Sequence, residues 1–282
     1  MRAAVAFVLP LLANPVAAAM PGLEKGHAKG QFLLGTYPDD SLLRAAIGTP
    51  SHDINGELRL QFSGGHKRFA WQGDYQLIAR HGDTVELSRA LSGSFLVPGA
   101  TLEDDQRLLD LTHVISEDHN RILLHRLDRL HVGWSGEKAV LRLGRQAVSW
   151  GNGLIYNPVD FFNPFDPAAV DTEYKNGDDM LYAQYLQDSG NDWQFVSVWR
   201  RDEDSDLTSR VNTNALKYHA FIGGREADLL LAQHYRDDIF ALGGLSDLGG
   251  AIARGDLMVT HTDQDTYASL VVNLSYSWTA WD

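Results

Sequence analysis

The stretch TYASLVVNLSYSW, residues 266–278, changes character with every residue. One set of alternating positions is apolar and ends in two aromatic residues: Ala268, Leu270, Val272, Leu274, Tyr276 and Trp278. The other set is small and mostly polar: Tyr267, Ser269, Val271, Asn273, Ser275 and Ser277. Because successive side chains of a strand point to opposite faces of its sheet, the pattern predicts a β-strand with one apolar and one polar face. The stretch is longer than the roughly five or six residues usual in soluble sheets, and it suits the roughly 9 to 11 tilted residues that cross a bilayer.

Residues 68–80, RFAWQGDYQLIAR, repeat this alternation, with Asp74 and Gln76 on the more polar side. Shorter or less regular strands are predicted at residues 57–62, 84–91, 122–134, 139–149, 180–186, 193–200, 215–222, 227–235 and 251–261. Polar turn clusters join many of them, which indicates an antiparallel meander. Residues 41–47 are compatible with a turn or two of helix, whereas residues 92–120 and 150–179 are not predicted to be strands.

Such a meander fits either a membrane barrel or a soluble β-sandwich. In a sandwich the apolar face forms the core, whereas in a barrel it meets lipid and the polar face lines the lumen. Aromatic residues near the ends of the apolar faces favour the barrel: Phe69, Trp71, Trp134, Trp193, Trp199, Tyr276 and Trp278. Residues 122–134 fit neither arrangement cleanly, because their charged side chains fall on both faces. We predict an all-β fold, an antiparallel meander that forms a transmembrane outer-membrane β-barrel with long inserted loops.

The beginning of the chain indicates export. Arg2, an apolar run and three alanines at residues 17–19 have the layout of a secretory signal peptide, so residues 1–19 are expected to be cleaved. Residues 20–282 then form a single barrel domain. No apolar stretch in them approaches the roughly 18 to 20 residues that a membrane helix needs.

Composition excludes several classes of function but does not decide between barrel and sandwich, because a mean hydropathy of −0.24 fits both. A net charge of −13 without a basic block argues against nucleic acid as a partner. The absence of cysteine excludes disulfides, thiol nucleophiles and thiolate metal sites.

Four motifs carry a resemblance to a known family: LDRL at residues 127–130, LGRQAVSWG at 143–151, NPVD at 157–160 and EYKNGD at 173–178. Together they are similar to the central signature of porin-like outer-membrane β-barrels of Gram-negative bacteria, of which alginate-export and substrate-selective porins are looser relatives. The resemblance implies passive passage or binding of small polar solutes, with outer-membrane lipid and the barrel-insertion machinery as partners. It implies neither catalysis nor a cofactor, and it leaves the oligomeric state open.

This chain departs from such barrels at its end, where Asp282 stands in place of the expected terminal aromatic residue. About eleven strands can be counted, whereas single-chain bacterial barrels have an even number. Either the count is wrong or the chain is truncated at its C-terminus, and we expect truncation and therefore an incomplete barrel.

Residues 150–179 combine glycines, prolines, aromatics and acids, and cannot continue a strand ladder. We expect them to fold into the barrel mouth as a constriction loop, with a lid or a plug as the alternative. The expected loop anchors are Trp150, Phe161, Phe162 and Phe165. The expected constriction residues are Asp160, Asp166, Asp171, Glu173, Arg142 and Arg145, and the expected lumen-facing residues are Asp74, Gln76, Asn273 and Ser275. Arg145 breaks the apolar side of its strand, so it marks either the membrane rim or a side chain turned into the lumen. With so many acids in the chain, a modest preference for cations is the natural expectation.

Two other functions stay open. A periplasmic or secreted carbohydrate-binding β-sandwich would also show alternating strands. An outer-membrane hydrolase could use Ser149 with His125 and Asp128, although nothing in their spacing requires it. The loop acids lack the spacing of a calcium loop, so no metal site is predicted. The paired glycines at residues 243–244 and 249–250 are expected to be strand kinks or turns and not a phosphate-binding loop.

Overall fold

The computed structural model describes residues 5–9, 22–90, 104–162, 164 and 174–278. The strands are β1 (Val5–Leu9), β2 (Leu23–Gly35), β3 (Ser51–His66), β4 (Phe69–Gly82), β5 (Thr112–Asp118), β6 (Arg121–Ser135), β7 (Ala139–Gln146), β8 (Asp178–Leu186), β9 (Asp192–Val198), β10 (Thr213–Ile222), β11 (Arg225–His234), β12 (Asp237–Asp247), β13 (Ala251–His261) and β14 (Thr266–Tyr276). The helices are α1 (Leu42–Ile47) and α2 (Asp83–Ala90). Neither of these helices is long and apolar enough to cross a membrane.

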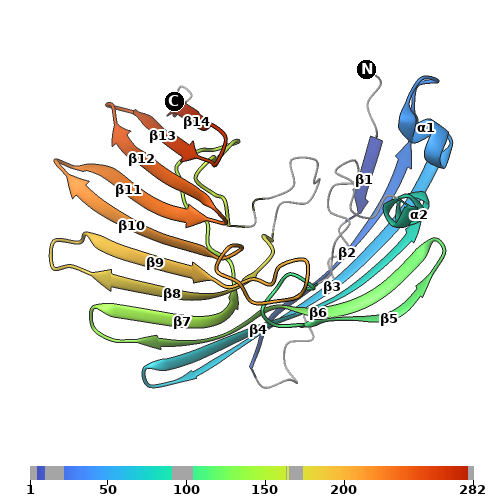
Figure 1. Ribbon diagram of the computed structural model, residues 1–282, viewed down its shortest axis with the longest axis horizontal. Helices are drawn as coiled ribbons and strands as arrows, with labels where there is room; N and C mark the ends of the chain where they lie inside the picture. Colours follow the sequence, from blue (N-terminus) through green and yellow to red (C-terminus); the bar gives the residue numbers. More distant parts are fainter. Residues whose placement is uncertain (1–4, 10–21, 91–103, 163, 165–173, 279–282) are drawn as a thin grey trace.

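The strands form one antiparallel sheet in which each strand pairs with its neighbours along the chain. Only β5 lies off this path, paired with β6. The sheet curves into an open trough, with β1 and β2 at one rim, β14 at the other, and the connection between β9 and β10 inside (Figure 1). Within the described residues β1 pairs only with β2 and β14 only with β13, so this sheet is not closed. The predicted all-β antiparallel meander, expected to be incomplete as a barrel, is confirmed.

Several elements differ from the sequence prediction. Residues 84–91, predicted as a strand, mostly belong to α2, because Asp53 Oδ1 accepts hydrogen bonds from the backbone nitrogen (2.9 Å) and hydroxyl (2.7 Å) of Thr84 at the start of the helix. Residues 92–120 were not expected to contain a strand, yet β5 lies within them. The prediction also omitted β2 and β12, whose glycines obscure the alternation. The short helix expected at residues 41–47 is present as α1, which Ser41 caps.

The two faces of the sheet have opposite character. On the convex side, here called the outer face, apolar side chains are exposed; Leu270 and Val272 of β14 are 68% and 69% exposed. On the concave side, here called the inner face, charged side chains are buried; Asp74 of β4 and Asp128 of β6 are 2% and 1% exposed. The apolar surface of this sheet therefore points outward and its charges point inward.

The two ends of the strands also differ. At one end, here called the hairpin end, short turns join β3 to β4, β6 to β7, β8 to β9, β10 to β11 and β12 to β13. The other end, here called the loop end, carries the long connections at residues 83–111, 147–177 and 199–212. Strand β2 begins and β14 finishes at the hairpin end. The first strand β1 lies within residues 1–19, whose cleavage as a signal peptide stays a prediction.

Candidate functional site

The connection between β7 and β8 crosses the inner face of the sheet. Trp150 is buried there, and its indole Nε1 donates a hydrogen bond to Gln194 Oε1 of β9 at 2.8 Å. The Trp150 and Phe162 rings meet edge to face at 5.1 Å. Phe161 packs on Phe162 and on the ring of His234 in β11. These side chains cover an apolar cluster on the inner face of β8 to β12, with Met180, Val196, Val198, Ala215, Leu230 and Ala241.

The same connection reaches the far side of the trough through Asn152. Asp256 of β13 accepts hydrogen bonds from the backbone nitrogen (2.5 Å) and the side-chain amide (2.8 Å) of Asn152. The backbone nitrogen of Leu154 donates to Asn273 Oδ1 of β14 at 3.1 Å. Gly243 of β12 makes this approach possible, because a Cβ there would lie 2.2 Å from Asp256 Oδ1. The loop is thereby attached to strands six and seven places along the sheet from β7, the strand from which it departs.

An ion pair between Asp160 and Lys175 joins the two halves of this connection. The Lys175 ammonium also donates to the carbonyl oxygen of Val148 at 2.7 Å. Burial raises the pKa of Asp160 and lowers the pKa of Lys175, and the pairing of the two groups opposes both shifts. Removal of either partner would leave a buried charge unpaired, which costs about 3–5 kcal/mol in comparable pairs.

Arg145 is fully buried on the inner side of the sheet between two carboxylates. Its guanidinium contacts Asp104 Oδ2 at 2.7 Å and Asp179 Oδ1 at 2.9 Å. The preceding Gly144 has a φ of +122°, and a Cβ there would lie 2.3 Å from the carbonyl oxygen of Leu130. The glycine interrupts the alternation of β7, so Arg145 does not follow Leu141 and Leu143 onto the outer face. Burial alone would raise the pKa of Asp104, but the hydrogen bond and charge of Arg145 outweigh burial and hold that pKa below its ordinary value.

A second buried cluster surrounds Asp128 of β6. Its carboxylate lies 2.9 Å from Arg59 of β3, 3.4 Å from Arg126 and 2.8 Å from Arg129. The pairing of β6 with β4 skips Asp128, which is therefore the extra residue of a β-bulge. The bulge shifts the alternation by one residue and so places Arg126, Asp128 and Arg129 on the same face. This explains why residues 122–134 follow no simple strand pattern.

The other predicted lumen residues lie on the inner face. Asp74 accepts hydrogen bonds from Gln61 and Gln72, and Gln76 accepts one from Arg126. Asn273 receives the loop, and the hydroxyl of Ser275 donates to the carbonyl oxygen of Ile252 at 3.5 Å. Arg142 stacks its guanidinium on the ring of Tyr182 at 4.3 Å. Phe165, Asp166, Asp171 and Glu173 lie outside the described residues.

Among the described residues of the expected constriction set, Asp160 and Arg145 do not contact each other. Asp160 pairs with Lys175, and Arg145 pairs with Asp104 and Asp179. Asp104, Asp256 and Lys175 were not predicted as site residues. Each is a charged residue in or near a strand with a polar inner face, but the local sequence does not identify the partner of such a charge.

The residues considered for a hydrolase are not brought together. His125 packs against the rings of Tyr75 and His113 on the outer face of β6, whereas Asp128 lies on the inner face. The hydroxyl oxygen of Ser149 accepts a long hydrogen bond from Lys175 Nζ at 3.5 Å. Among the described residues no group of three or more histidine and acidic side chains could hold a metal ion.

Comparison of the chain with models of known protein families gave no match, and comparison with curated protein sequences gave no match either.

Proposed function

We propose that this chain forms the wall of an outer-membrane β-barrel whose charged interior passes or binds small polar solutes. The observation that carries the proposal is the inverted distribution of side chains, with apolar groups exposed on the outer face and ion pairs buried on the inner face. A soluble sheet buries its apolar face, whereas a membrane barrel turns it toward lipid. The inner clusters would then line or fill the lumen.

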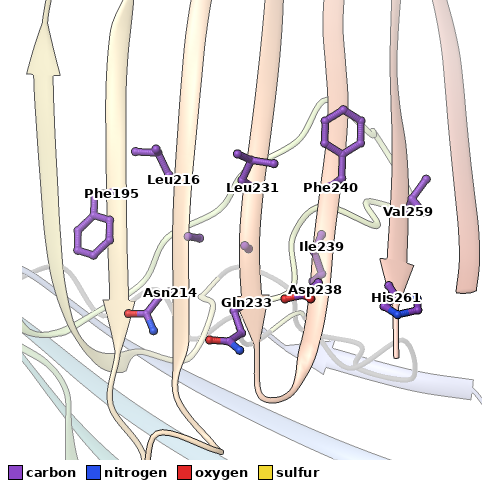
Figure 2. A pocket seen from close by; sticks show the side chains of 12 residues that line it. Phe195, Asn214, Leu216, Leu231, Gln233, Asp238, Ile239, Phe240, Val259 and His261 are labelled. Carbon is purple, nitrogen blue, oxygen red and sulfur yellow. The ribbon is translucent and has the colours of Figure 1, made fainter. Parts of the chain in front are cut away.

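The outer face carries a band that suits the hydrocarbon layer. Across β9 to β13, Phe195, Leu216, Leu231, Phe240 and Val259 form the apolar lining of a shallow hollow (Figure 2). Nearer the loop end the lining becomes polar: Asn214, Gln233, Asp238 and His261. A change from apolar to polar side chains at one height on several strands is expected where the hydrocarbon layer of a membrane ends.

An aromatic belt marks the hairpin end of the same face. Phe69 pairs with Trp134 across β4 and β6, and Tyr185 pairs with Trp193 across β8 and β9. The Trp193 ring lies 4.5 Å from that of Tyr218 on β10. Tyr and Trp prefer the boundary between lipid and water, because their rings are apolar and their tips are polar. The belt supports placement of the hairpin end at one membrane surface.

The open edges set a requirement on this proposal. Strands β1 and β14 are the edges of the described sheet, and cleavage of the predicted signal peptide would make β2 the edge in place of β1. An unpaired backbone group in lipid costs several kcal/mol, so both edges must pair with further strands in the membrane.

The proposal predicts opposite effects of arginine at adjacent positions of β14. Val272→Arg places a charge on the outer face, where it should cost about 2–4 kcal/mol in lipid. Val271→Arg places the same charge on the inner face, opposite Asp256, and should be tolerated. The chain, expressed with its N-terminal segment in a Gram-negative host, should fractionate with outer membranes and change its gel mobility on boiling. Val272→Arg should reduce this heat-modifiable form severalfold, while Val271→Arg should retain it.

Recovery of the unsubstituted chain in aqueous buffer without detergent, with no effect of Val272→Arg, would contradict a barrel. That result would favour a soluble carbohydrate-binding β-sandwich, because arginine at an exposed position of a soluble sheet costs little.

A further inference from the structure

The carboxylates of the inner face already have partners. Ion pairs join Asp74 and Asp128 to Arg59, Asp104 and Asp179 to Arg145, Asp178 to Arg200, Asp160 to Lys175, and Asp228 to Lys217. Asp256 is held by Asn152, and Asp192 accepts hydrogen bonds from the amides of Gln184 and Gln194. Arg107 lies beside Asp104, and Arg126 and Arg129 lie beside Asp128, so buried cations balance most of these acids. Asp256 and Asp192, whose partners are neutral amides, keep their negative charge.

Three arginines of the inner face, Arg80, Arg142 and Arg254, form no ion pair with a carboxylate among the described residues, and the last two also have a buried Nε without an acceptor. Arg142 of β7 lies over the ring of Tyr182, and its Nε is buried without an acceptor. Arg254 of β13 lies opposite Asn273 of β14, and its Nε is likewise buried without an acceptor. Each guanidinium keeps its positive charge, because arginine does not deprotonate at ordinary pH.

Arg142 and Arg254 occupy equivalent places in the sheet. Each is the fourth residue of a strand that begins at the hairpin end, in AVLR of β7 and in AIAR of β13. Both side chains therefore lie at a similar distance from the hairpin end, on strands that are six places apart in the sheet. Unpaired negative charge of the chain also lies on exposed acids outside the inner face, for example Glu203, Asp204 and Asp206 of the β9–β10 connection.

We propose that the solutes of this interior are small anions, which Arg142 and Arg254 attract near the hairpin end. The inference rests on the proposed pore and names the solute class that the pore accepts. A guanidinium is a strong partner for small anions such as carboxylates, and fixed charges of one sign on the lining of an interior raise the local concentration of counter-ions. The net charge of the whole chain suggests the opposite preference, because it does not distinguish exposed acids from those paired in the interior.

The test is the reversal potential of the purified protein in a planar bilayer with a potassium chloride gradient. The unsubstituted protein should be more permeable to chloride than to potassium. Arg142→Gln and Arg254→Gln should each reduce that permeability ratio by about twofold, since each removes one charge from a wet, partly screened interior. The double substitution should abolish the preference. Arg236→Gln, which removes an exposed arginine in the β11–β12 turn at the loop end, serves as the matched control and should leave the ratio unchanged.

A potassium preference, or a chloride preference that survives the double substitution, would overturn the inference while leaving the pore intact. Absence of conductance from heat-modifiable protein would instead contradict the proposed pore. In that case the line width of the chloride NMR signal in detergent micelles still decides the inference. Broadening that the double substitution removes would support anion binding by these arginines, and broadening that it leaves unchanged would overturn it.

Discussion

At the scale of single residues, Gly144 determines which way an arginine points. A non-glycine residue at its φ of +122° would be strained, and a Cβ would collide with the backbone of β6. Because Gly144 interrupts the alternation of β7, Arg145 reaches Asp104 and Asp179 and is not left on the outer face.

Gly144→Ala is therefore expected to destabilise the folded form by at least about 1–3 kcal/mol, the range for a strained backbone. The readout is the temperature at which gel mobility changes from the folded to the unfolded position. Gly56→Ala in β3 is the control, because a Cβ there meets no atom within 4 Å. Equal effects of the two substitutions would show that Gly144 has no special role.

At the scale of elements, regular alternation was enough to predict strands where nothing interrupts it. Residues 68–80 and 266–278 agree with β4 and β14 to within a few residues. Alternation failed where a glycine replaces an outward side chain, as in β2 and β12, and where a bulge shifts the faces, as at Asp128. It also failed at α2, a helix that is stabilised by a cap from Asp53 of β3. The failures at Asp128 and at α2 share a cause, because the contact that decides each of them lies in a distant part of the sequence.

The β7–β8 connection is another element that the local sequence predicts only in part. Its prolines and glycines predict a loop, but only the sheet places Asp256 and Asn273 where they receive Asn152 and Leu154.

Asn152→Ala should release part of this connection, because it removes the side-chain hydrogen bond to a charged acceptor, a contact worth about 1.5–3 kcal/mol. The expected result is faster cleavage of residues 149–160 by added protease and, in a bilayer, a larger single-channel conductance. Asn191→Ala, in the β8–β9 hairpin, removes a comparable amide at the other end of the sheet and should change neither. Unchanged cleavage in Asn152→Ala would mean that other contacts suffice to hold the loop.

At the scale of the whole molecule, the difference between the two strand ends predicts an orientation. Bacterial outer-membrane barrels have short periplasmic turns and longer extracellular loops. If the proposed membrane location is right, residues 199–212 face the cell exterior and the β8–β9 hairpin faces the periplasm.

The cysteine-free sequence allows a direct measurement of this orientation. A membrane-impermeant maleimide should label Asp204→Cys on intact cells and Asp188→Cys only after the outer membrane is permeabilised. Both positions are exposed and polar, so neither substitution should disturb folding. Labelling of Asp188→Cys on intact cells would reverse the proposed orientation.

The attachment of the β7–β8 connection also has a consequence for the order of assembly. Almost every strand of the path pairs with one that immediately precedes it, so the sheet can grow in step with the sequence by closing short loops. Asn152 and Asp256 are 104 residues apart, and Leu154 and Asn273 are 119 apart. The contacts that fix the connection can therefore form only after β13 and β14 have joined the sheet. A segment from the middle of the sequence then reaches its final position late in folding.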